Sequence, residues 1–382
     1  MEEKKKKIFV AMSGGVDSSV AAALLKKEGY DVIGVFMKAW QPRGLIHGQS
    51  FECLQTYDRR EAMRAAAHLG IPFFTFDFEK EYKKEVIDYM IAEYKAGRTP
   101  NPDVMCNKQI KFGAFLKKAH VMGADLIATG HYAKNVECRM WNMESGKKLQ
   151  ATSYKLQAGR DSAKDQSYFL WTLTQEQLSN VLFPIGEYTK PEVRELARKF
   201  GLPNAEKKDS QGLCFVGELN MKEFLKHYIK EKQGDVLNDK GEVIGHHDGA
   251  PFYTLGERHG FIITKKGPND PPQYIIAKDI KKNTLTVSPY RKGQTLKSET
   301  EKGLILEVRL KDINWVSGNV PDESKEYLAR FRYRQPLQRI RYKIQDTKYK
   351  ILFKEPQRAV ALGQSLVLYL NTGECLGGGI IT

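Results

Sequence analysis

The chain has 382 residues, a length that suggests two or three domains. Its hydrophobic fraction of 41% and aromatic fraction of 10% are ordinary for a folded protein and exclude a chain disordered throughout. The net charge of +15 favours a polyanionic partner such as nucleic acid, although a basic surface that only aids solubility explains the composition equally well.

The cysteines and the apolar runs exclude several further classes of protein. Five cysteines are too few, and odd in number, for a disulfide scaffold, and the absence of a Cys-x-x-Cys motif argues against zinc or iron–sulfur sites. There is no apolar run of about 18 residues to cross a membrane. The stretch Ile8–Met12, which follows the basic run Lys4–Lys7, is shorter than the roughly 7–15 apolar residues of a secretory signal. We therefore expect a cytoplasmic protein without membrane contact.

The first half of the chain alternates short apolar runs with helical patterns. Helices are expected over 18–27 and 59–69, and strands over 8–12, 32–37, 73–76 and 126–129. Strands separated by helices predict βαβ units and a parallel sheet, hence an α/β fold.

The pattern changes near residue 217. A helix is expected over Met221–Lys230, and turn dipeptides then separate β-rich runs at 274–277, 284–287, 304–310, 329–333, 350–353 and 365–370. This spacing is typical of small antiparallel sheets or barrels. We expect an α/β domain over 1–217, a small mixed or β-rich central domain over 218–290, and a C-terminal β-barrel over 291–382.

The first strand runs directly into a Gly- and Ser-rich turn, Ser13–Ser19, before a helix. Glycines let the backbone approach a ligand closely, and the free N–H groups of the helix favour an anion. Asp17 suits an anion site if Mg²⁺ bridges it to phosphates. The turn lacks the lysine of a Walker loop, and it resembles the S-G-G-x-D-S loop of ATP pyrophosphatases, which activate an oxygen by adenylation and release pyrophosphate. The resemblance implies ATP contacts at Ala11, Met12, Ser13, Gly14, Gly15, Val16, Asp17, Ser18, Met37 and Gly130.

Two loop segments narrow the substrate. They are Thr99–Asn107, which contains Cys106, and Asp209–Phe215, which contains Cys214. Both resemble the cysteine motifs of the bacterial tRNA-specific 2-thiouridylases, and further matches follow in family order nearly to the C-terminus, among them Gly130-His131-Tyr132, Lys164-Asp165-Gln166, Arg332-Tyr333 and Gly363-Gln364. One departure is Glu257-Arg258-His259-Gly260, where the family usually has Gln-Arg-Lys-Gly.

The resemblance implies ATP-dependent 2-thiolation of the wobble uridine in tRNAs for Lys, Glu and Gln. Cys214 would carry a persulfide, Cys106 would be the nucleophile or resolving thiol, and Asp103 would handle a proton. A cysteine desulfurase or a sulfur-relay protein would supply the sulfur. Asn101, Pro102 and Asp103 would meet the target base. The other tRNA contacts would be His131, Lys164, Asp165, Gln166, Arg332, Tyr333 and Gln364. The central domain, 218–290, would also contact RNA.

A basic stretch near the C-terminus predicts a second RNA contact. Residues 329–350 contain eight Lys or Arg and one acid, Asp346. In a strand, Arg330, Arg332 and Arg334 would share one face and could meet phosphates. A solvated charged strand is the alternative explanation.

Two other functions remain open on the sequence. A synthetase with the same ATP loop and a small substrate would explain the loop, but not the paired cysteines or the basic C-terminus. An RNA-binding protein with a relic nucleotide loop would release no pyrophosphate. Pyrophosphate release that depends on tRNA separates the three functions.

Overall fold

The computed structural model describes residues 5–42, 45–46, 49–144, 147–209, 214, 220–264, 267, 270–289, 304–345 and 348–382. The domain boundaries expected near 217 and 290 lie outside these residues. So do Ser210–Leu213 and Phe215 of the second cysteine motif, and Asp346. Among the described residues, none of the helices combines the length and apolar character needed to span a bilayer.

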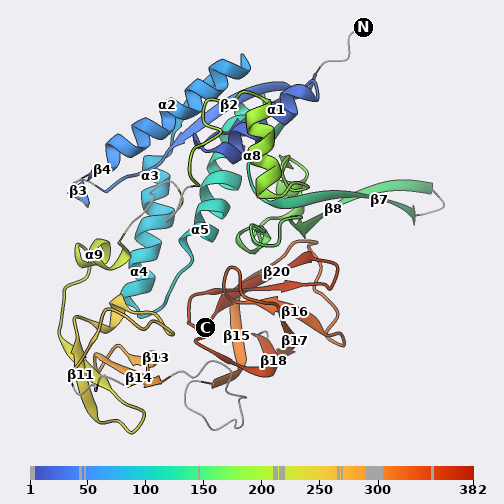
Figure 1. Ribbon diagram of the computed structural model, residues 1–382. Coiled ribbons are helices and arrows are strands. Elements are labelled where there is room, and N and C mark those ends of the chain that lie inside the picture. Colours follow the sequence, from blue (N-terminus) through green and yellow to red (C-terminus); the bar gives the residue numbers. More distant parts are fainter. Residues whose placement is uncertain are drawn as a thin grey trace.

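The N-terminal part is built on a sheet of five parallel strands in the order β5-β2-β1-β6-β9 (Figure 1). The four strands expected here are confirmed, and the fifth, β9, has only two residues. Neighbouring residues of the central strand, such as Phe9 and Val10, are both buried because helices cover both faces of the sheet. The strands are β1 (Lys7–Ala11), β2 (Asp31–Lys38), β5 (Phe73–Asp77), β6 (Leu126–Thr129) and β9 (Val181–Leu182).

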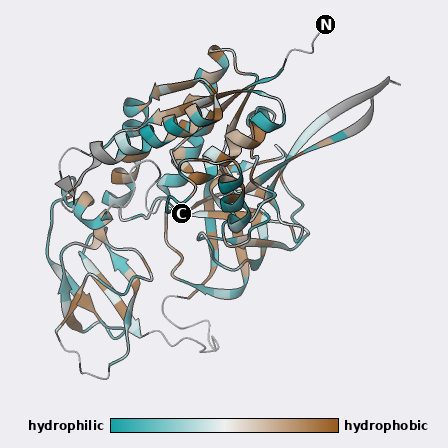
Figure 2. Cartoon of the chain, turned by 45° about the horizontal axis from the view of Figure 1, so that its top comes forward, coloured by the Kyte–Doolittle hydropathy of each residue, from teal (hydrophilic) through white to brown (hydrophobic). Residues whose placement is uncertain are grey.

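Both expected helices of this part are confirmed. They are α1 (Val16–Lys27) and α2 (Phe51–Leu69), the second of which begins eight residues earlier than the apolar pattern indicated. Along the helices that flank the sheet, hydrophobic and hydrophilic residues alternate (Figure 2). Further helices in this part are α7 (Gln175–Leu178) and α8 (Lys190–Lys199), and a short hairpin pairs β3 (Leu45–Ile46) with β4 (Gln49–Ser50).

Two long helical stretches lead from the sheet toward the central domain and back (Figure 1). The outgoing stretch comprises α3 (Glu79–Tyr82), the π-helical segment η1 (Lys83–Asp88) and α4 (Tyr89–Lys95). The returning stretch comprises α5 (Pro102–Met105), the π-helical segment η2 (Cys106–Phe115) and α6 (Leu116–Val121). The Asn101 side chain caps the returning stretch by accepting the Val104 N–H at 3.2 Å.

The central part is a small mixed sheet in the order β12-β11-β10-β14-β13. The two expected strands are present as β13 and β14, and the expected helix is shorter than predicted, ending at Lys226. One pairing, β10 with β14, is parallel, and the others are antiparallel. The elements are α9 (Met221–Lys226), β10 (Gly234–Leu237), β11 (Val243–His247), β12 (Ile262–Ile263), β13 (Gln273–Asp279) and β14 (Thr284–Pro289).

The C-terminal part is a closed antiparallel barrel, as expected. Six strands follow the order β15-β18-β17-β16-β19-β20, and β20 pairs back with β15 to close the barrel. A buried aromatic and aliphatic cluster that includes Trp315, Phe331 and Tyr342 fills its interior. The strands are β15 (Leu304–Trp315), β16 (Tyr327–Arg330), β17 (Gln338–Gln345), β18 (Lys348–Arg358), β19 (Ser365–Tyr369) and β20 (Glu374–Ile381).

A long hairpin that the sequence analysis did not predict joins the first part to the barrel. Its strands are β7 (Ala133–Glu144) and β8 (Lys147–Ala158). Strand β8 pairs with β20 through Leu156 opposite Cys375, so that the hairpin extends the barrel sheet. The N-terminal and C-terminal parts therefore share main-chain hydrogen bonds.

The prediction that Arg330, Arg332 and Arg334 share one face of a strand is wrong. Strand β16 ends at Arg330, and Pro336 shortly afterwards has no N–H to continue a ladder. Arg330 is only 8% exposed and forms an ion pair of 2.5 Å with buried Asp165, while Arg334 has a φ of +63°. The outward cations lie instead on β17, where Arg339, Arg341 and Lys343 alternate with buried Ile340 and Tyr342.

Candidate active site

The Ser13–Ser18 turn forms a cradle at the carboxyl end of β1. The Ser18 hydroxyl accepts the Ser13 N–H at 3.2 Å and donates to the Gly15 carbonyl at 3.2 Å, which fixes the turn. Gly14 has a φ of +79°, and a Cβ there would lie 2.2 Å from the Asp58 carbonyl oxygen. Only glycine fits this position, and the helix that follows directs its free N–H groups toward the cradle.

A cavity of about 470 Å³ begins at this cradle and extends to the second cysteine motif. Of the ten residues predicted to bind ATP, eight line it, whereas Met12 is buried beneath the sheet and Gly14 faces Asp58. A pocket of this size at the carboxyl edge of a parallel sheet suits a nucleotide. The eight are Ala11, Ser13, Gly15, Val16, Asp17, Ser18, Met37 and Gly130.

Charged side chains cluster at the cradle end of the cavity. Asp17 accepts hydrogen bonds from Lys190 at 2.6 Å and from the Tyr132 hydroxyl at 2.8 Å. Asp209 forms ion pairs with Lys164, Lys190 and Arg194 at 2.6, 2.9 and 2.7 Å. Although burial opposes it, pairing with Lys164 and Lys190 lowers the pKa of Asp209 to about 2. The surplus of cations suits a polyphosphate, and the Asp17 carboxylate offers a ligand for Mg²⁺.

Cys106 and Cys214 lie beside each other at the other end of the cavity. The Cys106 and Cys214 sulfur atoms are 3.6 Å apart although 108 residues separate them. Asp103 accepts the Cys214 N–H at 3.1 Å, and the buried Tyr82 hydroxyl donates to the Cys214 carbonyl at 2.6 Å. Cys106 is fully buried, whereas Cys214 and Asp103 line the cavity. Cys214 is therefore the thiol that a ligand in the cavity can reach.

The surroundings of the two thiols shift their pKa values in opposite directions. A hydrogen bond from the Cys106 thiol lowers the pKa of Cys214 to about 7; burial opposes the shift, and Lys111 assists it. Burial, together with the Cys214 sulfur, raises the pKa of Cys106 well above its usual range. Burial also raises the pKa of Asp103. Cys214 is consequently the thiolate of the pair near neutral pH, and a thiolate is the form that accepts sulfur.

Lys111 is a site residue that the sequence analysis missed. It lines the cavity, interacts with Cys106 and Cys214, and lies 3.3 Å from Nε2 of His131. Burial acts to lower the pKa of Lys111, but the two sulfur atoms and Asp103 raise it overall. Since an ammonium only donates, Nε2 of His131 accepts, and its protonated Nδ1 donates to Thr129 at 2.7 Å. Lys111 is thus a cation held beside the thiols.

The residues predicted to contact tRNA fall into two groups. Lys164, Gln166, His131 and Tyr333 line the cavity, and Asp103 does so beside them. The others hold the protein together: Asp165 pairs with Arg330, and Arg332 donates to the Leu255 and Ala359 carbonyls at 2.8 Å. Three further members of this second group also act within the protein. Asn101 caps α5, and Pro102 is the first residue of α5. Gln364 donates to the Thr99 carbonyl at 2.8 Å.

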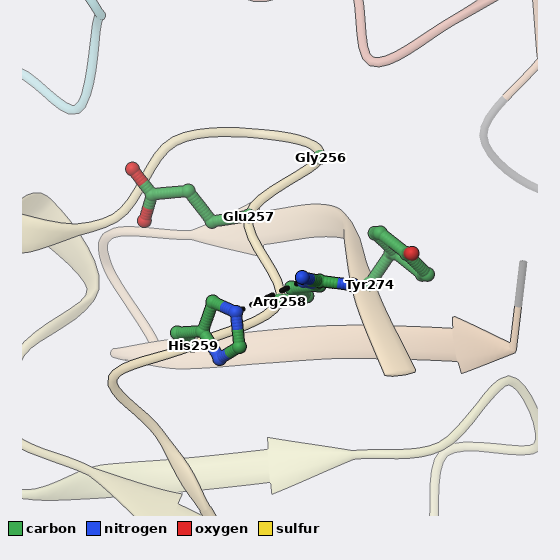
Figure 3. A pocket seen from close by; sticks show the side chains of 5 residues that line it. All are labelled: Gly256, Glu257, Arg258, His259 and Tyr274. Carbon is green, nitrogen blue, oxygen red and sulfur yellow. Dashed lines mark hydrogen bonds between the residues drawn. The ribbon is translucent and has the colours of Figure 1, made fainter. Parts of the chain in front are cut away.

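A second cavity, of about 450 Å³, lies on the central domain at the departure from the family motif (Figure 3). Arg258 donates to Nε2 of His259 at 2.9 Å, and Glu257 points away from this pair. Gly256 and Tyr274 complete the lining. The described residues that line this cavity include no thiol, so we place the chemistry in the first one.

The cradle geometry predicts the effect of one substitution. Gly14→Ala should lower ATP affinity about tenfold or more, because the methyl group displaces the Asp58 backbone and opens the cradle. Gly29→Ala is the matched control, since Gly29 has a φ of +92° and nothing within 4 Å of its Cβ position. Both changes carry the cost of a left-handed backbone, about 1–2 kcal/mol, and Gly14→Ala adds the clash with Asp58. Equilibrium binding of ATP should separate them; equal affinities would contradict the assignment of the cradle.

Comparison with known proteins divides the chain into the same three parts as the structure. Family models match residues 6–218 (tRNA methyl transferase HUP domain), 222–289 (tRNA methyl transferase PRC-barrel domain) and 306–381 (Aminomethyltransferase beta-barrel domain). The tRNA-specific 2-thiouridylase MnmA of Geobacillus thermodenitrificans is 46% identical over 376 residues, covering 98% of this chain and 94% of the relative. That of Streptococcus thermophilus is 44% identical over 381 residues, covering 100% and 96%.

The chain belongs to the tRNA-specific 2-thiouridylase family. A solved complex of a 4-thiouridine synthetase with RNA and ATP is 18% identical and covers 58% of this chain and 50% of its own. Its TM-score of 0.32 is too low to bear on the fold.

Proposed function

We propose that this protein is a tRNA sulfurtransferase that converts the wobble uridine of tRNAs for Lys, Glu and Gln to 2-thiouridine. The observation that carries the proposal is a single cavity that joins an ATP-type cradle to Cys214, whose sulfur lies 3.6 Å from that of Cys106. A small-substrate synthetase or an RNA-binding relic would have no use for that pair. Family membership supports the same conclusion.

The first step is activation of the base. The uridine 2-oxygen attacks the α-phosphate of ATP, pyrophosphate leaves, and the O-adenylated base has AMP as a good leaving group at C2. Lys190 and Lys164 line the cavity and would contact the phosphates, and Asp17 would hold Mg²⁺. Mg²⁺ would neutralise the charge that develops on the phosphates.

The second step is sulfur transfer. A cysteine desulfurase or a relay protein loads a persulfide on Cys214, whose pKa of about 7 makes it the better acceptor. The terminal sulfur attacks C2 and AMP leaves, so the base is joined to Cys214 through a disulfide. Cys106, its proton removed by Asp103, then attacks the Cys214 sulfur. The Cys106–Cys214 disulfide forms, 2-thiouridine is released, and an external thiol reduces the disulfide.

Cations beside the cavity and on β17 form the proposed RNA surface. Lys164, Gln166 and Arg334 line the cavity mouth, and Arg339, Arg341 and Lys343 give β17 a basic outer face. Phosphate contacts of this kind position an RNA without reading its sequence. We propose that the base enters the cavity between them, at a cost of a few kcal/mol for unstacking.

Product analysis tests the proposed function. Purified protein, ATP, Mg²⁺, a cysteine desulfurase with cysteine, a reducing thiol and an unmodified tRNA transcript should give AMP and pyrophosphate, and neither product should form without tRNA. Chromatography of the spent nucleotide gives the answer. ADP with phosphate, or AMP formed equally fast without tRNA, would refute the proposal.

A further inference from the structure

All three parts of the chain meet on one short segment, Arg98–Asn101, which leads into α5. The Thr99 N–H donates to the Leu362 carbonyl of the barrel at 2.7 Å. The Thr99 hydroxyl lies 3.2 Å from that of Thr254 in the central part. Gly363, with a φ of +89°, packs so closely that a Cβ there would lie 3.0 Å from the Thr99 carbonyl oxygen.

Gln364 completes this junction from the barrel. Its side-chain amide donates to the Thr99 carbonyl at 2.8 Å and to the Pro100 carbonyl at 3.2 Å. Both N–H donors of one half-buried side chain are therefore used by the same two residues of the N-terminal part. Family resemblance assigned Gln364 to tRNA, but this geometry occupies its donors within the protein.

The junction is connected to the thiols through a short chain of bonds. Asn101, which follows Pro100, caps α5 through the Val104 N–H. Asp103 lies in α5 and accepts the Cys214 N–H, and Cys106 begins the next segment, 3.6 Å from the Cys214 sulfur. A shift of Thr99 or Pro100 would therefore move Asp103 and Cys106 relative to Cys214.

We propose that Gln364, through the Thr99 and Pro100 carbonyls, is a positioning residue that holds the Asn101–Cys106 segment in register with Cys214. The inference rests on the proposed function only in taking these thiols as the reacting groups. It gives the barrel a role in the reaction beyond RNA binding: the barrel sets the geometry of the sulfur-transfer pair. Its failure and that of the proposed function are distinguishable, because the thiol geometry is measured without RNA or ATP.

The test compares Gln364→Met and Gln364→Glu, neither of which can donate to the two carbonyls, with Gln345→Met. Gln345 is an exposed residue of the same barrel. Alkylation of Cys214 by iodoacetamide is followed by mass spectrometry against pH, with tRNA and ATP absent. We expect the alkylation midpoint to rise by roughly 1 pH unit in both Gln364 variants, because Cys214 loses its aligned partners. The control should match the unaltered protein.

Steady-state thiolation supplies the second measurement. We expect kcat to fall roughly 10- to 100-fold in both Gln364 variants, with KM for tRNA changed less than about twofold. Gly363→Ala should act in the same direction, since its methyl group presses on the Thr99 carbonyl. Weaker tRNA binding with an unchanged alkylation midpoint would make Gln364 an RNA contact and overturn the inference. An unchanged midpoint with unchanged kcat would overturn it as well.

Discussion

Replacement of Cys214 by serine should reduce tRNA thiolation by about 10³-fold or more, because the reactive sulfur then has no carrier. Cys214 is the thiol that lines the cavity and has the pKa of about 7. Cys106→Ser should still accept sulfur on Cys214 yet fail to release thiolated tRNA. Mass spectrometry after incubation with a desulfurase and cysteine locates the added sulfur.

The remaining cysteines serve as controls for this experiment. Cys375 is buried, and burial raises its pKa to about 12, so Cys375→Ser should leave sulfur loading intact. Added sulfur found only on Cys53, Cys138 or Cys375 would contradict the assignment of Cys214. Loading of Cys106 in place of Cys214 would reverse the two roles.

Lys111→Met should raise the pKa of Cys214 above about 7 and slow sulfur loading near neutral pH. Loading requires the thiolate, whose population rises with pH through the pKa, so the rate profile should shift to higher pH and the deficit should shrink toward pH 9. Loss of a buried cation beside a developing charge costs roughly 10²-fold in rate at pH 7. Loading rates measured from pH 6 to 9 test this.

Lys108→Met is the matched control for Lys111→Met. Lys108 belongs to the same π-helical segment but is exposed, so its loss removes a similar charge without touching the thiols. Its profile should follow that of the unaltered protein. A parallel loss at every pH in Lys111→Met would indicate damage to the fold and would contradict an electrostatic role.

Much of the architecture could be predicted because strong local patterns produced it. Residues 8–12 and 126–128 are uninterrupted apolar runs, and they lie in adjacent strands of the sheet. The β7–β8 hairpin was missed although Val136–Met140 and Tyr154–Ala158 alternate apolar and polar residues, which is the pattern of a strand. Its pairing with β20 depends on residues more than 200 positions away, which no local pattern reports.

The site was predicted less completely, and Lys111 shows why. In an α-helix, a residue five positions after Cys106 lies about 140° round the axis and would face elsewhere. The structure places both in the π-helical segment η2, where i→i+5 bonding brings such residues onto successive turns of the same side. A sequence analysis that assumes α-helical spacing therefore places Lys111 away from Cys106.

Arg330 illustrates the opposite error. Its alternation with Arg332 suggested that both arginines face solvent. The sequence does not reveal that a distant carboxylate lies beside Arg330. In the folded chain Asp165 supplies that carboxylate, which also accepts the Ser167 N–H at 3.0 Å. A charged pair with further hydrogen bonds tolerates burial that a lone arginine would not.

The pairing of β20 with three other strands has a consequence for synthesis of the chain. Glu374–Ile381 is synthesised after the three strands with which it pairs, and it closes the barrel against β15 and β19 and covers the edge of β8. Until then the nascent protein carries three open strand edges, which are the surfaces most prone to aggregation. A premature stop codon before Glu374 should therefore produce insoluble protein, not a shorter enzyme.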